Sequence, residues 1–320
     1  MPTNEFIIYY DSLSECIWFQ GLHPSFANAQ RRLIGTRTNN PPFINSLLLY
    51  DKPDIILTCN DEPVLVIEKT SEVPTGHNVG QRFARLVRAV ELGVTTICFF
   101  PFDSRKHGLY SSICNLNIRF IKAAQKMYQI HNTPLLAVNW QADNRGELVN
   151  DGSEDDRLKE ILGNFVSSGF NKNCNEIINQ LEYMSNEYAR RLLAKPSYAR
   201  FPNSVLIQST DSFLSQYRIA NAPMSIVNRP NTLVYKIEMT PDSCKRQDPY
   251  TGMQFIYDYI SCRTGTVPSD KHNNLVLHFP HLTQSLWNSK NPNNLATKSS
   301  NWYLTANILL FADGYCINIP

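Results

Sequence analysis

The residues best suited to chemistry are two carboxylates and a lysine at the ends of two short apolar segments. Asp54 opens the first segment, residues 54–59, and the adjacent pair Glu68 and Lys69 lies near the end of the second, residues 63–70. A polar turn separates the segments, which predicts a β-hairpin that brings both carboxylates to one end. Carboxylates on neighbouring strands supply the hard oxygen ligands that Mg²⁺ prefers. A metal bound there would polarise a phosphate and activate water, with a lysine to position that water or neutralise developing charge.

The order of these features resembles the PD-(D/E)xK superfamily of restriction-endonuclease-like nucleases. Pro53-Asp54, a hairpin, Glu68-Lys69, a helix and an apolar strand follow one another over about residues 45–140. The resemblance implies an α/β fold with a mixed central β-sheet flanked by helices. It also implies that Asp54 and Glu68 bind Mg²⁺ and that Lys69 is the catalytic lysine.

The spacing of the charged pair departs from that family. Family members place the second acid and the lysine two residues apart, so that both side chains leave one face of the strand. Here they are adjacent, and Thr70 stands at the lysine position. A bulge could turn Lys69 toward Glu68, Ile67 could stand at the acidic position, or another base could substitute. The other candidate residues nearby are Lys52, Lys106 and Glu72.

The same charges are also explained as solvated groups at the end of a strand. A short combination of Pro-Asp with a later Glu-Lys occurs often by chance in unrelated sequences. The context favours the nuclease interpretation, because the predicted hairpin lies at the centre of an apolar sheet. Charged groups without a role are costly at such a place.

A helix is predicted over residues 79–92, where apolar positions recur every three and four residues. Asn78 is its expected N-cap and Gly93 its expected C-terminal stop. Polar and basic residues form a stripe opposite the apolar face, and arginine forks suit phosphate oxygens. A solvated helix face explains the stripe nearly as well. The residues predicted to contact nucleic acid are Gln81, Arg82, Arg85 and Arg88.

The chain divides into a predicted core at residues 1–195 and a strand-rich region at 196–320. In the core, we expect one or two helices over residues 5–36. The further core predictions are strands at 46–50, 54–59, 63–70, 95–102 and 134–140, and helices at 113–130, 157–167 and 173–194.

In the C-terminal region, basic residues alternate with aromatic ones over residues 244–263. Lys245 and Arg246 are therefore predicted to contact DNA, although a turn beside an aromatic core explains them slightly better. His278 and His281 are spaced like metal ligands, but the intervening Pro280 and the lack of suitably spaced cysteines argue against zinc.

Composition sets the broad class of the protein. The chain has 320 residues, of which 42% are hydrophobic, and a formal charge of +2, so a globular protein is expected and charge alone does not demand a nucleic-acid partner. The eight scattered cysteines indicate reduced thiols in a cytoplasmic protein. No signal peptide or membrane span is expected. The sequence contains no G-x-S-x-G motif of serine hydrolases, no Walker phosphate-binding loop and no G-x-G-x-x-G dinucleotide-binding motif.

The sequence therefore predicts a Mg²⁺-dependent endonuclease that hydrolyses the phosphodiesters of double-stranded DNA, most simply a type II restriction endonuclease. By analogy with the family we expect a homodimer or larger homo-oligomer. Two alternatives stay open. One is a non-specific defence or repair nuclease with the same fold, and the other is a nucleic-acid-binding protein without catalysis.

Overall fold

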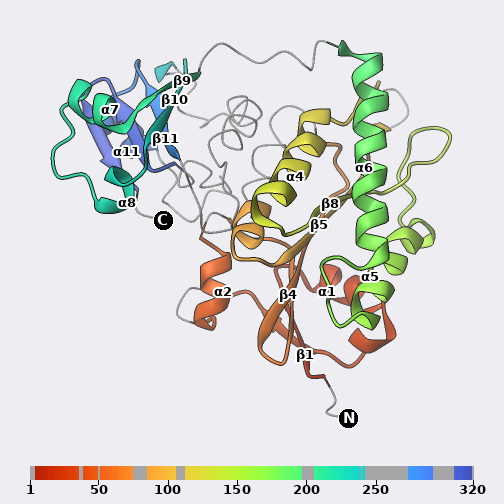
Figure 1. Cartoon of the computed structure of the whole chain (residues 1–320). Helices are drawn as coiled ribbons and strands as arrows, with labels where there is room; N and C mark the ends of the chain where they lie inside the picture. Colours follow the sequence, from red (N-terminus) through yellow and green to blue (C-terminus); the bar gives the residue numbers. More distant parts are fainter. Residues whose placement is uncertain are drawn as a thin grey trace.

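The computed structural model describes residues 4–35, 39–49, 51–74, 85–105, 112–196, 205–238, 240–241, 273–290 and 306–318. Their main element is a six-stranded sheet with the order β2-β1-β3-β4-β5-β8 (Figure 1). The β1/β3 and β3/β4 pairs are antiparallel and the other pairs are parallel, so the sheet is mixed. Its strands are β1 (Phe6–Tyr10), β2 (Gln30–Leu33), β3 (Ile55–Cys59), β4 (Glu62–Lys69), β5 (Thr95–Phe100) and β8 (Leu135–Asn139).

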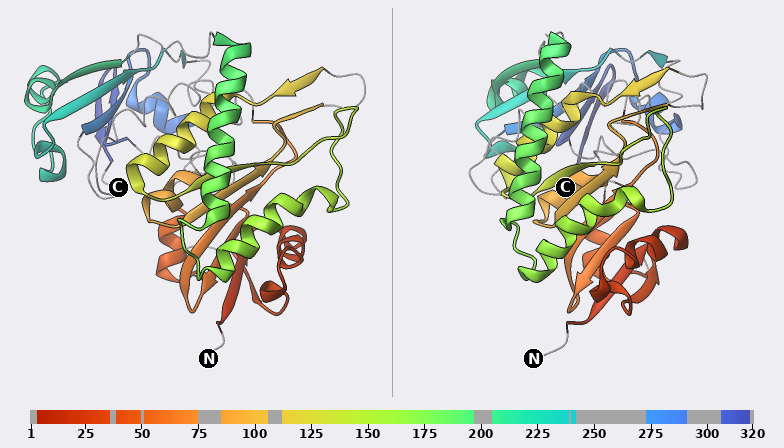
Figure 2. Two further views of the ribbon diagram at one scale, coloured as in Figure 1. Left: turned by 45° about the vertical axis from the view of Figure 1, so that its right-hand side comes forward. Right: turned by 90° about the vertical axis from the view of Figure 1, so that its right-hand side faces the viewer.

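Helices cover both faces of this sheet. Phe120 of one helix packs on Phe100, while Trp18 of another packs on Phe99, and adjacent strand residues face opposite sides. Figure 2 shows α6 running beside α4, and the two helices contact each other and β8. The helices are α1 (Leu13–Gln20), α2 (Pro42–Leu47), α4 (Ile118–His131), α5 (Asp156–Ser167) and α6 (Asn175–Ala194), with a further helix at residues 85–91 and 3₁₀ turns η1 (Pro24–Phe26) and η2 (Ser153–Asp155).

The prediction of an α/β fold with a mixed central sheet and flanking helices is confirmed at this level. The four strands expected at residues 54–59, 63–70, 95–102 and 134–140 are present, and the hairpin lies at the centre of the sheet. The expected stop at Gly93 is also confirmed: its φ is 80°, in the left-handed region that glycine adopts without steric cost.

Three local predictions were wrong. Residues 6–10 and 30–33 are strands rather than helix: the apolar run of β1 is buried between β2 and β3, and the exposed β2 pairs in parallel with β1 at the edge of the sheet. Residues 46–49, the described part of the strand expected at 46–50, are not a strand: α2 begins at Pro42, whose fixed φ suits the first helical position, and extends to Leu47. The helix expected from residue 113 begins at 118 after its N-cap Asn117, and residues 113–115 form β7, which pairs with β6 (Asp103–Arg105).

The C-terminal region contains a second sheet with the order β13-β12-β11-β10-β9. Alternate residues of its strands enter two apolar clusters, one around Trp287 and one around Phe213. The region is therefore α/β as well, rather than only strand-rich. Its elements are β9 (Val205–Ser209), α7 (Thr210–Gln216), α8 (Met224–Val227), β10 (Asn231–Lys236), β11 (Asn273–Phe279), α11 (Gln284–Lys290), β12 (Ile308–Phe311) and β13 (Gly314–Ile317).

Within the ranges given above, no helix combines the length and the apolar character that crossing a membrane requires.

Candidate active site

The β3–β4 hairpin brings Asp54 and Glu68 to the same end of the sheet. Its turn residues Asn60 and Asp61 have φ values of 52° and 64°, as the tight turn of a two-residue hairpin demands. Ile55 then pairs with Ile67, so that Asp54 lies beside Glu68 in the next register position. The predicted meeting of the two residues follows directly from this turn and register.

Lys69 does not turn toward Glu68. The only register shift in this hairpin lies at Leu57/Thr58, near the turn, and Glu68 and Lys69 continue the regular pairing with β5. Their side chains therefore point to opposite faces of the sheet. A bulge at the strand end, one of the explanations left open by the sequence, is excluded.

The backbone of Lys69 is nevertheless part of the cluster. Its N–H donates a hydrogen bond of 2.7 Å to Oδ2 of Asp54, and the Asp54 side chain is buried. A backbone donor holds the aspartate in one orientation without adding a mobile side chain. Asp54 is thus fixed at the boundary between the two faces on which Glu68 and Lys69 lie.

On one face of the sheet, the buried Glu68 forms an ion pair with Arg85. Its side chain is 2% exposed, and its Oε1 lies 2.8 Å from Nη1 of Arg85. Nε of the same guanidinium lies 2.8 Å from Oδ2 of Asp51. Burial alone would lower the pKa of Arg85, but the carboxylates of Glu68, Asp51 and Asp54 raise it above its usual value. Arg85 therefore holds a positive charge among three carboxylates.

On the other face, the Lys69 amine lies against two tryptophans. Its Nζ is 4.2 Å from the ring centroid of Trp18 and 4.8 Å from that of Trp140. Phe99 is stacked against both rings, with centroids 5.9 and 5.3 Å away. Burial lowers the pKa of Lys69, and the carboxylates of Asp155, Glu15 and Asp54 act in the opposite direction. This environment makes the neutral amine more accessible than at a solvated lysine.

The two indoles are anchored by their own hydrogen bonds. Nε1 of Trp18 donates to Oδ2 of Asp155 at 2.8 Å, and Nε1 of Trp140 donates to the carbonyl of Val149 at 2.9 Å. Both acceptors follow β8 in the chain, Val149 before η2 and Asp155 at the end of η2. This part of the chain thus contributes to the surroundings of Lys69 from far along the sequence.

Glu15 is a further carboxylate near Lys69, and the sequence did not reveal it. It lies on α1 and lines a pocket of about 370 Å³ together with Lys69 and Trp140. Burial, followed by the nearby charges of Asp54 and Asp11, raises the pKa of Glu15 to about 7. Carboxylates gathered in this way repel one another, and a bound cation would relieve the repulsion.

In the sequence, the position of Glu15 is most simply explained as part of a helix cap. Ser12 and Glu15 have the spacing of a helix capping box. The Ser12 hydroxyl caps no backbone N–H of α1 and instead lies 2.7 Å from the Ser14 hydroxyl, so the acid is not explained by a capping box.

The other predicted site residues are either bonded within the protein or lie outside the described part of the chain. Arg88 is not on an open basic stripe: its side chain is 17% exposed, and its guanidinium lies 3.3 Å from Glu91 and donates to the carbonyl of Ser46. Lys52 pairs with Asp11 near the surface. The DNA-contact predictions for Arg85 and Arg88 stay predictions, although both groups are bonded within the protein. Residues outside the described part are Gln81, Arg82, Lys106, Lys245 and Arg246.

The donor set suits Mg²⁺ chemically, but it is small. The described residues contain no group of three or more His, Cys, Asp or Glu side chains that could hold a metal ion together. Mg²⁺ is commonly bound through one or two carboxylates and keeps several waters. Asp54 with Glu68 meets that lower requirement, and Glu15 adds negative charge on the other face.

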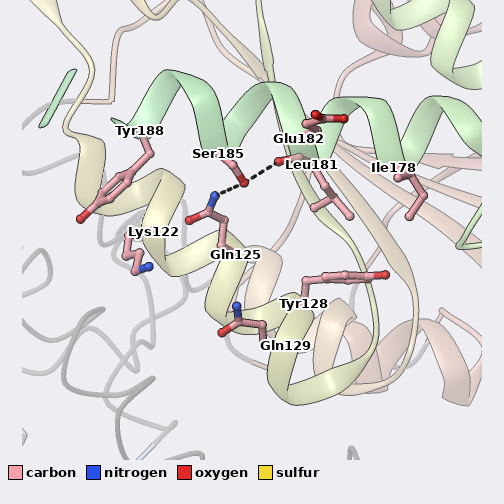
Figure 3. Close-up of a pocket in the computed structure, with 9 residues that line it drawn as sticks. All are labelled: Lys122, Gln125, Tyr128, Gln129, Ile178, Leu181, Glu182, Ser185 and Tyr188. Atoms are coloured by element: carbon pink, nitrogen blue, oxygen red, sulfur yellow. Dashed lines mark hydrogen bonds between the residues drawn. The ribbon is translucent and has the colours of Figure 1, made fainter. Parts of the chain in front are cut away.

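A larger groove of about 620 Å³ lies between α4 and α6 (Figure 3). Lys122 lies over the ring of Tyr188, and Gln125 donates to Ser185 across the groove. No set of carboxylates converges there, since Glu182 is the one acid among its lining residues. The hairpin end is therefore the better candidate for chemistry.

Comparison of the chain with protein-family models, with curated proteins and with solved structures gives no match in any of the three. The functional assignment accordingly rests on the residues and their geometry.

Proposed function

We propose that the protein is a Mg²⁺-dependent endonuclease that hydrolyses phosphodiester bonds of double-stranded DNA. The observation that carries the proposal is the hydrogen bond from the Lys69 backbone to Asp54. It joins the acid before β3 to the acid–lysine pair that ends β4, in a single cluster at the centre of a mixed sheet. The sequence resemblance to the PD-(D/E)xK nucleases names the same three residues.

In this proposal Asp54 and Glu68 hold the metal, which supplies Lewis-acid stabilisation of the phosphate and a more acidic bound water. Glu68 would share its carboxylate between Arg85 and the metal, since both are cations. The hydrogen bond from the Lys69 backbone would hold the Asp54 carboxylate in a fixed orientation at the metal.

Lys69 and Glu15 take the roles that require proton transfer or charge compensation. The half-buried Lys69 amine, with its lowered pKa, is suited to accept a proton from attacking water or to neutralise charge on the phosphate. Glu15, with a pKa near neutrality, is suited to exchange protons at physiological pH. Both side chains line the same pocket.

A second candidate function is DNA binding without cleavage. It is favoured by one observation: Arg85 already supplies a cation to Glu68 and Asp51. If that ion pair is permanent, Arg85 takes the place of a metal ion at Glu68, and the protein would bind DNA without cleaving it.

Incubation of supercoiled plasmid DNA with the protein, with and without Mg²⁺, separates the two functions. The nuclease proposal predicts cleavage only with Mg²⁺, and a loss on the order of a thousandfold in Asp54→Asn, equal to about 4 kcal/mol of transition-state stabilisation. Asn at position 54 can still accept the Lys69 N–H, so the fold should persist. Discrete fragments would indicate a restriction endonuclease, and a smear a non-specific nuclease.

Two controls make the result specific. Asp156→Asn removes an acid whose side chain is 84% exposed and should leave cleavage unchanged. Lys69→Met should abolish cleavage, whereas Lys52→Met should not, because Lys52 lies in a surface pair with Asp11. Retained DNA affinity without cleavage by the folded wild type would support the binding function instead.

A further inference from the structure

Four strands lie at the edges of the two larger sheets: β2 and β8 in the first, β9 and β13 in the second. An edge strand presents unpaired backbone N–H and C=O groups, which form a template for a strand from another chain. Stable proteins protect their edges with charges, bulges or covering groups. The four edges of this protein can therefore be compared directly.

Three of the edges are protected. β2 carries Arg31 and Arg32, whose charges oppose pairing with an identical strand. At β8, the N–H of Ala137 donates to Sδ of Met184 at 3.3 Å, and Gln180 donates to the Ala137 carbonyl at 2.7 Å, so α6 occupies the outer backbone groups.

The second sheet has one protected edge. At β13, Nε2 of Gln284 donates to the carbonyl of Tyr315 at 2.6 Å. A side chain from α11 therefore bonds to the backbone of this strand, as α6 does for β8.

The fourth edge is β9, which lies beside β10 in the second sheet (Figure 1). Its sequence, VLIQS, contains no charge, proline or glycine. Leu206 is 53% exposed and Ile207 is 63% exposed, although their partners on β10, Val234 and Leu233, are buried. Among the described residues, no side chain bonds to the backbone of β9. The strand thus exposes apolar side chains on both faces of the sheet, at an edge that no other described strand covers.

We infer that β9 is a dimer interface, at which β9 of a second copy of this chain pairs antiparallel and continues the sheet through both copies. A two-fold axis brings a strand against itself in the antiparallel sense, so the same residues meet on both sides. The absence of charge in β9 removes the repulsion that such self-pairing causes at β2. Leu206 and Ile207 lie near the middle of the strand, where the second copy would cover each side chain on its own face of the joined sheet. The inference does not depend on the proposed nuclease activity.

Light scattering after size-exclusion chromatography tests this interface, because it measures mass and not activity. The wild-type chain should have about twice its monomer mass of 36.6 kDa. The double variant Leu206→Lys and Ile207→Lys should have half of the wild-type value, since paired lysines repel across the edge. Leu193→Lys is the matched control: Leu193 on α6 is 82% exposed, and its variant should remain dimeric.

A monomeric wild type at all concentrations would overturn the inference and leave the edge to a partner other than this chain. A folded double variant that stays dimeric would overturn it as well, because the dimer would then form elsewhere. If the double variant does not fold, hydrogen exchange of the wild type decides. The amides of β9 should exchange more slowly as dimer forms with increasing concentration, and equal rates at all concentrations would contradict the interface.

Discussion

At the C-terminal end of β4, the adjacent residues Glu68 and Lys69 point to opposite faces of the sheet, and their charged surroundings differ. On the Glu68 face, Arg85 pairs with Glu68 and Asp51 at 2.8 Å, and the charges compensate one another. On the Lys69 face, the pKa of Glu15 is raised and that of Lys69 is lowered, beside an open pocket. The comparison teaches that one charged pair on a strand serves two purposes. The first face stabilises the fold, and the second retains electrostatic strain that a bound ligand can relieve.

The largest loss of stability is expected from Arg85→Met, on the Glu68 face. Removing the guanidinium takes the principal cation from the buried Glu68, and breaking a buried pair from one side typically costs about 3–5 kcal/mol. Urea unfolding of wild type and variant measures the difference. Arg190→Met is the control, since that side chain is 66% exposed beside Glu187 and should cost at most about 1 kcal/mol. Equal costs would show that the Glu68 face has no special role in stability.

A smaller effect is expected from Trp18→Leu on the Lys69 face. The variant loses the ring stacked on Phe99 and the hydrogen bond to Asp155, at a cost of about 2 kcal/mol. Water then reaches Lys69, so its pKa should rise toward the ordinary value for lysine, because burial is the main cause of its lowering.

NMR titration of the reductively methylated protein measures that pKa. Trp287→Leu, in the apolar cluster of the second sheet, is the control that destabilises the protein without affecting Lys69. An unchanged Lys69 titration in Trp18→Leu would show that the tryptophans do not set the environment of the amine.

The smallest effect concerns the pH dependence contributed by Glu15. Its pKa rises from an ordinary 4.5 to about 7 on folding, so the folded state holds the proton more tightly than the unfolded state. Wild-type stability should therefore fall relative to Glu15→Gln between pH 4.5 and 7 and then level off. Because Glu15 is only partly buried, solvent limits the difference to about 1–2 kcal/mol.

Unfolding of both proteins at a series of pH values checks the sign. A constant difference between wild type and Glu15→Gln would contradict the crowding of carboxylates on this face. A difference that disappears when Mg²⁺ is added would sharpen the comparison, since a cation would then replace the proton.

The sequence predicted the parts of the site that depend on local pattern. The apolar runs of β3 and β4 and the polar turn between them determine the register, so Asp54 and Glu68 could be placed together. The same pattern determines that Glu68 and Lys69 point to opposite faces of the sheet. Their adjacent spacing therefore separates the acid from the lysine, whereas the family spacing places both on one face.

The rest could not be predicted because it depends on contacts between distant segments. Glu15 and Trp18 come from α1, and Trp140 follows β8, so only the folded sheet brings them to Lys69. Arg85 matched the pattern of an exposed phosphate ligand but lies against Glu68, since helical spacing does not specify what packs above a residue. The apolar spacing of residues 5–36 fitted a helix, but the buried position between β2 and β3 made residues 6–10 a strand.

The central claim is that Asp54 and Glu68 hold a divalent metal at the end of the β3–β4 hairpin. Binding of Mn²⁺, followed by electron paramagnetic resonance without DNA, tests it most directly. The account predicts one Mn²⁺ per chain in the wild type and in Asp156→Asn, competition by Mg²⁺, and loss of binding in Asp54→Asn and Glu68→Gln. Equal Mn²⁺ binding by wild type, Asp54→Asn and Glu68→Gln, or no binding by the folded wild type, would contradict it.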